Sequence, residues 1–157
     1  MIPDRIRYKV LTIVVVCCFY LINDNLHAQA FGSAGWESFE GVTFESQYDA
    51  SIDDYQLLPN FGEEVLLKQG KKIKLTGYYV PFDLEDGAVI LSRYPYAQCF
   101  FCGNAGPESV AEIYFKQRGQ EFLPDQLLSV TGILKLNTKD ANHLNFIIEE
   151  AELIEKQ

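Results

Sequence analysis

From residue 72 to the C-terminus, apolar side chains fall repeatedly at every second position, and this periodicity constrains the fold more than any other feature. Period two places alternate side chains on opposite faces of an extended strand. Glycines inside two of these segments, Gly77 and Gly132, indicate bulges or sharp bends, because glycine gives up packing inside a strand. The segments are 72–81, 88–93, 110–115, 128–136 and 144–154. Five bent strands joined by loops predict a mainly β fold, a small closed barrel rather than a flat open sheet.

One short helix is expected immediately before these strands. Apolar residues there recur at spacings near three and four, which is typical of one helical face. The pattern predicts a helix from Asn60 to Leu67, with Asn60 as its N-cap. Upstream, the acidic stretch 49–54 is interpreted as a loop, and Trp36 and Phe39 as apolar anchors in a segment that is a short strand or lies across the domain.

The first thirty residues have the pattern of a cleavable secretory signal. Arg5, Arg7 and Lys9 precede an apolar run of thirteen residues, 10–22. A membrane-spanning helix needs roughly 20 apolar residues, whereas the apolar region of a signal peptide has about 7–15. The small-x-small triplet 28–30 follows, so cleavage is expected after Ala30. The predicted location is the periplasm or outside the cell, and the alternative is an uncleaved membrane anchor.

The remaining 127 residues are strongly acidic. Residues 31–157 hold ten of the thirteen basic and twenty of the 22 acidic side chains, a formal net charge of −10. Binding to nucleic acid depends on lysine and arginine displacing counterions from phosphates. Nucleic acid and, after cleavage, an anionic membrane surface are therefore not expected as partners. The chain is long enough for one domain with a real core, and its oligomeric state is left open.

Three sequence segments together resemble a known family. They are Gly-Lys-Lys-Ile-Lys-Leu-Thr-Gly-Tyr-Tyr-Val-Pro at 70–81, a cysteine loop that leads to Pro107, and Val-Thr-Gly-Ile-Leu at 130–134. The chain is similar over 59–154 to exported bacterial proteins catalogued as a domain of unknown function. The resemblance implies an OB-like barrel in the cell envelope, with an association to transport or metal handling. Members carry Cys-x-His before a proline run, where this chain has Cys99 and Cys102 before Gly103.

This resemblance completes the expected domain organisation. Residues 1–30 are the signal peptide, 31–58 an N-terminal extension and 59–157 the OB-like β-barrel domain, a five-stranded barrel with one short helix.

The pair Cys99 and Cys102 is the most chemically distinctive motif of the predicted mature chain. In an oxidising compartment two thiols at this spacing can form a disulfide, exchange electrons or hold half of a zinc site. The following Gly103 suits a tight turn in the left-handed conformation. A zinc site would need further ligands, for which His143, a carboxylate or another subunit are the candidates. Zinc is thus a candidate cofactor, and all three roles stay open.

Aromatic residues surround the cysteines and define a candidate ligand face. Barrels of the OB type bind on one face and its loops, which makes ligand binding the expectation for four residues here: Tyr94, Tyr96, Phe100 and Phe101. The alternative role of the two phenylalanines is to plug the barrel mouth. No nucleophile motif accompanies His143, the one histidine after residue 30, so hydrolase chemistry has no support.

Two function hypotheses remain at this stage. The preferred one is a secreted or periplasmic binding or accessory protein, not an enzyme, that holds an envelope protein or a metal ion with the barrel face around residues 94–107. The alternative is a small thiol-disulfide oxidoreductase, with Cys99 as the attacking thiolate and Cys102 as the resolving thiol.

Overall fold

The computed structural model describes residues 35–50, 53–82, 84 and 86–157. The predicted signal peptide and its cleavage site lie outside these residues. Within the described ranges, no helix has both the length and the apolar character needed to cross a bilayer.

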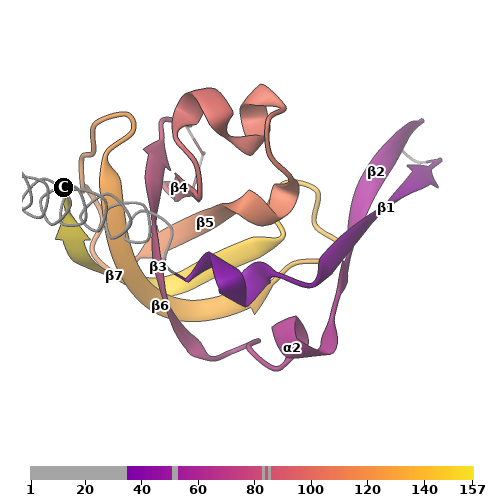
Figure 1. Ribbon diagram of the computed structural model, residues 1–157, viewed down its shortest axis with the longest axis horizontal. Helices are drawn as coiled ribbons and strands as arrows, with labels where there is room; N and C mark the ends of the chain where they lie inside the picture. Colours follow the sequence, from indigo (N-terminus) through magenta and orange to yellow (C-terminus); the bar gives the residue numbers. More distant parts are fainter. Residues whose placement is uncertain (1–34, 51–52, 83, 85) are drawn as a thin grey trace, which may run out of the picture. The chain divides into compact units, whose positions relative to one another are not determined.

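Five strands close into a barrel in the order β3-β4-β5-β7-β6, which confirms the predicted fold class (Figure 1). β5 and β7 pair in parallel, and the other neighbouring strands pair antiparallel. The predicted segments agree with the observed strands to within a few residues. The strands are β3 (Lys72–Val80), β4 (Val89–Ser92), β5 (Val110–Phe115), β6 (Leu127–Leu136) and β7 (Phe146–Lys156).

The barrel interior is filled by alternate side chains of all five strands. Leu75, Leu91, Ile113 and Leu134 are examples, and each is fully buried. Alternation explains this arrangement, because each strand directs every second residue inward. The interior is therefore a packed core and not a channel.

A 3-10 turn upstream of the barrel, η1 (Trp36–Phe39), closes the core with two aromatic side chains. The indole N–H of Trp36 donates to the carbonyl of Thr76 at 2.7 Å. The ring of Phe39 stacks on Phe146 with 4.1 Å between centroids. Burial of one such side chain contributes roughly 1.5–3 kcal/mol, so this N-terminal segment is part of the domain core.

The two glycines predicted to bend strands lie where other chain segments approach closely. A Cβ at Gly132 would lie 2.7 Å from the carbonyl of Glu149, and the register of β6 against β7 shifts between Thr131 and Ile133. A Cβ at Gly77 would lie 2.6 Å from the carbonyl of Ser92. The predicted interruption at Gly132 is thus confirmed.

A β-hairpin precedes the barrel, where the sequence predicted a short strand or a segment across the domain, then a loop over 49–54 and a helix. The turn of the hairpin lies within the predicted loop. Its strands are β1 (Val42–Asp49) and β2 (Asp54–Phe61), and the helix α2 (Glu63–Leu66) follows. Asn60 lies in β2, and the N-cap of α2 is Gly62. The spacing of Leu57 and Phe61 fits period two as well as a helical face, and pairing with β1 decides in favour of the strand. The helix exists but is shorter than predicted.

The 3-10 turns η2 (Tyr96–Gln98), η3 (Phe100–Cys102) and η4 (Pro107–Ser109) form most of the connection from β4 to β5. We call residues 93–109 the cysteine loop.

Candidate binding site

The cysteine loop covers the outer face of the barrel at β3, β4 and β5 (Figure 1). Val80, Ile90 and Val110 alternate with core-facing neighbours and belong to a second apolar cluster. They are at most 2% exposed, although they lie outside the barrel. Covering side chains come from three connections between strands: Leu84, Phe100, Phe101 and Leu144.

The two phenylalanines of the cysteine loop are half-buried in this second cluster. Phe101 stacks on Phe82 with 4.7 Å between centroids and meets Phe100 edge-on at 5.4 Å. Both phenylalanines therefore pack on the outer face of β4 and β5 and do not plug the barrel interior. The side chains that fill the barrel interior form a separate cluster.

The cysteines lie on a tight turn of the expected shape. The N–H of Cys102 donates to the carbonyl of Cys99 at 3.1 Å, and the N–H of Gly103 donates to Phe100 at 2.9 Å. Gly103 has φ 75°, the left-handed conformation that suits glycine. The predicted glycine turn is thus confirmed. η3 has three residues, too few to create the strong dipole found at the N-terminus of a long helix.

The two thiols of this turn are free and differ in access. Cys99 is fully buried and Cys102 is exposed. The thiol of Cys102 donates to the carbonyl of Tyr96 at 3.1 Å. Loss of solvent around the sulfur, and then a hydrogen bond with the Cys99 thiol, raise the pKa of Cys102. A raised pKa lowers the thiolate fraction, and the thiolate is the reactive form.

His143 pairs with a buried carboxylate. Its Nδ1 lies 3.0 Å from Oε2 of Glu112, which is 2% exposed, and its Nε2 lies 3.9 Å from Asp140. Among the residues that the structure describes, no three His, Cys, Asp or Glu side chains converge in a way that could hold a metal ion. The candidate ligands Cys99, Cys102 and His143 are therefore not brought together in one cluster.

Glu112 holds the loop between β6 and β7 against the barrel. Its Oε1 accepts the N–H of Leu144 at 2.6 Å, and its Oε2 accepts the hydroxyl of Tyr114 at 3.2 Å. The hydroxyl of Tyr114 also donates to Asp86 in the connection between β3 and β4. Burial, and then the hydrogen bond to Asp86, raise the pKa of Tyr114, and the same bond lowers the pKa of Asp86. Glu112 thus links β5 to the β6–β7 connection, and Tyr114 links β5 to the β3–β4 connection.

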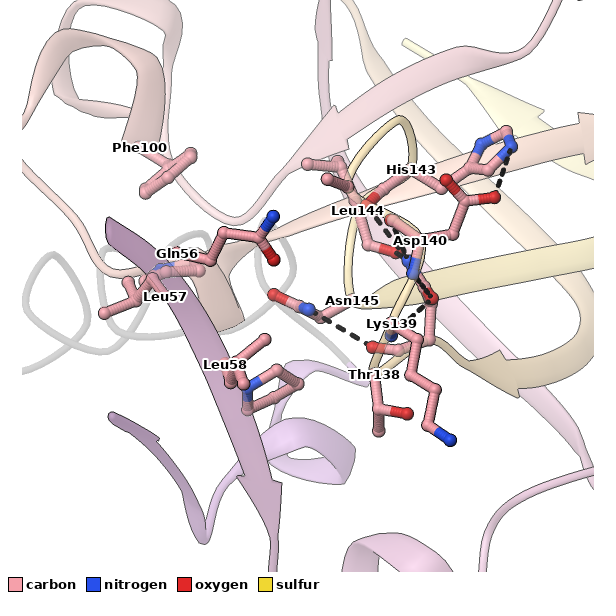
Figure 2. Close-up of a pocket in the computed structure, with 14 residues that line it drawn as sticks. Gln56, Leu57, Leu58, Phe100, Thr138, Lys139, Asp140, His143, Leu144 and Asn145 are labelled. Carbon is pink, nitrogen blue, oxygen red and sulfur yellow. Dashed lines mark hydrogen bonds and ion pairs between the residues drawn. The ribbon is translucent and has the colours of Figure 1, made fainter. Parts of the chain in front are cut away.

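A pocket of about 220 Å³ lies next to this network (Figure 2). Leu57 and Leu58 of β2 are on one side, and Lys139, Asp140 and His143 of the β6–β7 connection are on the other. Pro59, Phe100, Pro107 and Leu144 add apolar surface. Sites for small molecules usually have about 300–1,000 Å³. A pocket of this size fits one apolar side chain better than a cofactor.

The four candidate ligand residues fall into different environments. Phe100 lines the pocket, and Phe101 packs against Phe82. Tyr94 and Tyr96 are 38% and 44% exposed and do not line it. The N–H of Tyr96 donates to Asp125 at 2.6 Å, which ties the cysteine loop to the chain before β6.

Three site features were missed at the sequence level. They are the buried Glu112, its partner Tyr114 and the contribution of β2 to the pocket. The alternation along residues 110–115 contained a signal for the burial of Glu112, because Glu112 shares its strand face with the apolar Val110.

The fold and site define a small closed β-barrel protein whose outer face is covered by a cysteine-bearing loop and edged by an apolar pocket. No protein-family model and no curated protein matches the chain. Among solved structures, the chain is similar to a DUF3299 family protein from Pseudomonas aeruginosa, with 15% identity and a TM-score of 0.43. The similarity covers 63% of this chain and 69% of that one.

Proposed function

We propose that this protein is a secreted or periplasmic binding or accessory protein. It holds an envelope protein partner on the outer face of an OB-like barrel, in the pocket between β2, the cysteine loop and the β6–β7 connection. The single observation that carries this function is the apolar pocket, whose volume of about 220 Å³ fits a side chain.

The position of the pocket supports the same function. Barrels of the OB type bind ligands on the face of their second and third strands and on the connections that flank it. Here the second and third barrel strands are β4 and β5, and one of the two flanking connections, between β6 and β7, lines the pocket through Leu144. Leu84 of the other connection packs in the second apolar cluster. The network around Glu112 fixes both connections to β5, so the site is organised before a partner arrives.

The electrostatic surroundings suit a protein partner better than nucleic acid. Residues 31–157 carry a formal net charge of −10, which would repel phosphates. A metal-linked variant of this function would need ligands from a second protein, because no chelating cluster is present among the described residues.

The thiol-disulfide alternative has one observation in its favour, the position of Cys99 and Cys102 on one tight turn with both thiols free. Two others weigh against it. The attacking thiol would be Cys99, which is fully buried. The accessible thiol, Cys102, has a raised pKa, and exchange requires an accessible thiolate.

A variant that fills the pocket tests the binding function. Ala141 lines the pocket and is exposed, so Ala141→Trp blocks it without removing a core contact. Ala97→Trp, at an exposed alanine outside the pocket, is the control. The full chain is cross-linked in its native envelope and its complexes are quantified by mass spectrometry.

The expected result is a specific partner complex with the natural chain and with Ala97→Trp, and about a tenfold loss with Ala141→Trp, which corresponds to about 1.4 kcal/mol. Absence of any specific complex, or an equal yield from both variants, would overturn the proposal.

A further inference from the structure

One edge of the strand β2 pairs with no other strand among the described residues. The N–H of Gly62 donates to the carbonyl of Gly41 at 3.2 Å, which sets the phase of the β1–β2 ladder. Bonded and non-bonded pairs alternate along an antiparallel ladder. The backbone groups of Asn60, Leu58 and Gln56 therefore bond to β1. The backbone groups of Leu57 and Pro59 point away from β1. The missing N–H of Pro59 agrees with this phase, because proline tolerates only the free side of an edge strand.

No further strand pairs with this edge in the part of the chain that the structure describes, since β1 and β2 form a two-stranded sheet. The four consecutive residues 56–59 all line the pocket. Successive side chains of a strand point to opposite faces, so a cavity that touches four in a row runs along the strand edge. The pocket and the free edge of β2 are therefore one continuous surface.

One face of the hairpin is an apolar stripe that leaves the core and becomes exposed. Opposed residues of an antiparallel pair lie on the same face. Phe61, opposite Val42, belongs to the core, and Leu57 further along the same face is 49% exposed. The cross-strand pair Tyr48 and Tyr55 extends the stripe at 50% and 68% exposure, with ring centroids 5.4 Å apart.

The charge of the hairpin indicates what covers this surface. Residues 42–61 contain four acidic side chains, at positions 45, 49, 53 and 54, and no lysine or arginine. A second copy of the hairpin would bring two such acidic sets together, and like charges across a strand pair are unfavourable. A basic segment would be complementary.

We propose that an extended, basic segment of a partner protein adds as a strand to the free edge of β2 and inserts one apolar side chain into the pocket. In this recognition mode main-chain hydrogen bonds supply affinity and pockets for alternate side chains supply specificity. The backbone N–H and carbonyl of Leu57 bond to the added strand, and Leu57, Phe100 and Leu144 contact the inserted side chain. This strand addition rests on the proposed function and names the kind of partner that it binds.

A proline substitution tests the backbone groups at this edge. Leu57→Pro removes the outward N–H and leaves the bonds to β1 in place, as Pro59 already does. Ser46→Pro is the matched control, because Ser46 lies opposite Leu57 and directs its N–H to the other edge of the hairpin. The probe is a displayed library of random peptides, selected on the full chain and on both variants.

The expected result is enrichment of peptides that alternate basic and apolar residues on the full chain and on Ser46→Pro. The best synthetic peptide should bind Leu57→Pro at least about tenfold more weakly, because the substitution removes one backbone hydrogen bond and also the Leu57 side chain that lines the pocket. N-methylation of alternate backbone nitrogens in that peptide should also abolish binding.

Three outcomes would overturn the strand addition: equal enrichment on Leu57→Pro, equal weakening by Ser46→Pro, or dominant acidic peptides. A native envelope complex that is lost in Ala141→Trp but insensitive to Leu57→Pro would contradict the added strand while the proposed function stands. Absence of any envelope complex would instead count against the proposed function.

Discussion

Oε1 of Glu112 accepts a 2.6 Å hydrogen bond from the backbone N–H of Leu144, 32 residues away in the chain. This contact joins β5 to the connection that forms one side of the pocket. The buried carboxylate therefore stabilises the shape of the site as well as the domain.

Replacing Glu112 should destabilise the domain and loosen the pocket together. In Glu112→Ala the N–H of Leu144 and the ring of His143 lose their buried acceptor, which should lower the free energy of unfolding by about 2–3 kcal/mol. Urea unfolding measures the change. Glu149→Ala, which removes an exposed ion pair with Lys135 at 2.8 Å, is the control and should cost less than about 1 kcal/mol. Equal effects of the two substitutions would contradict the structural role of Glu112.

The bond between Tyr114 and Asp86 should make part of the stability depend on acid pH. The pKa of Asp86 is lowered by this bond, so its contribution is present above the unfolded pKa, near 3.8, and is lost as pH falls through the lower folded value. The natural chain should exceed Asp86→Asn in unfolding free energy at pH 6, and this difference should shrink by pH 2.5. A difference in unfolding free energy that grows toward acid pH would contradict a lowered pKa of Asp86 in the folded protein.

The two cysteines of the turn should differ in reactivity. Cys102 is exposed and has a raised pKa, and Cys99 is fully buried. Iodoacetamide at pH 8 should therefore label Cys102 more slowly than a free cysteine, and Cys99 only after denaturation. Both cysteines lie in one tryptic peptide, 94–116, so fragmentation of that peptide in tandem mass spectrometry locates the label. Faster labelling of Cys99 in the folded protein would revive the thiol-disulfide alternative.

Gly132 should tolerate no side chain. A Cβ there would lie 2.6 Å from Cγ2 of Ile148 and 2.7 Å from the carbonyl of Glu149, so Gly132→Ala should lower the free energy of unfolding by about 1–3 kcal/mol. Gly119→Asn is a control, because that glycine has φ 81° and a Cβ added to it would meet no described atom within 4 Å, and asparagine accepts the left-handed region. Thermal unfolding of both variants measures the contrast, and a neutral Gly132→Ala would argue against the tight β6–β7 contact.

The sequence predicted the barrel because its strands bury one face, and burial imposes period two on the residues. The strand β2 was missed because the apolar positions before residue 67 also fit a helical face, and only pairing of β2 with β1 distinguishes a strand from a helix there. The role of Glu112 depends on partners 31 and 32 residues away, which no local pattern encodes. Phe100 lines the pocket, and its role in ligand binding stays a prediction, whereas the metal role predicted for His143 has no cluster to support it among the described residues. The secretory signal stays a prediction.

Photo-cross-linking from β2 tests the central claim most directly. A photoreactive phenylalanine analogue is placed at Leu57, in the pocket, or at Ile154 on β7, since these side chains are 49% and 50% exposed. In cells that produce the full chain, position 57 should give one discrete partner adduct and position 154 none. Equal adducts at both positions, or adducts at position 154 alone, would contradict binding at the pocket.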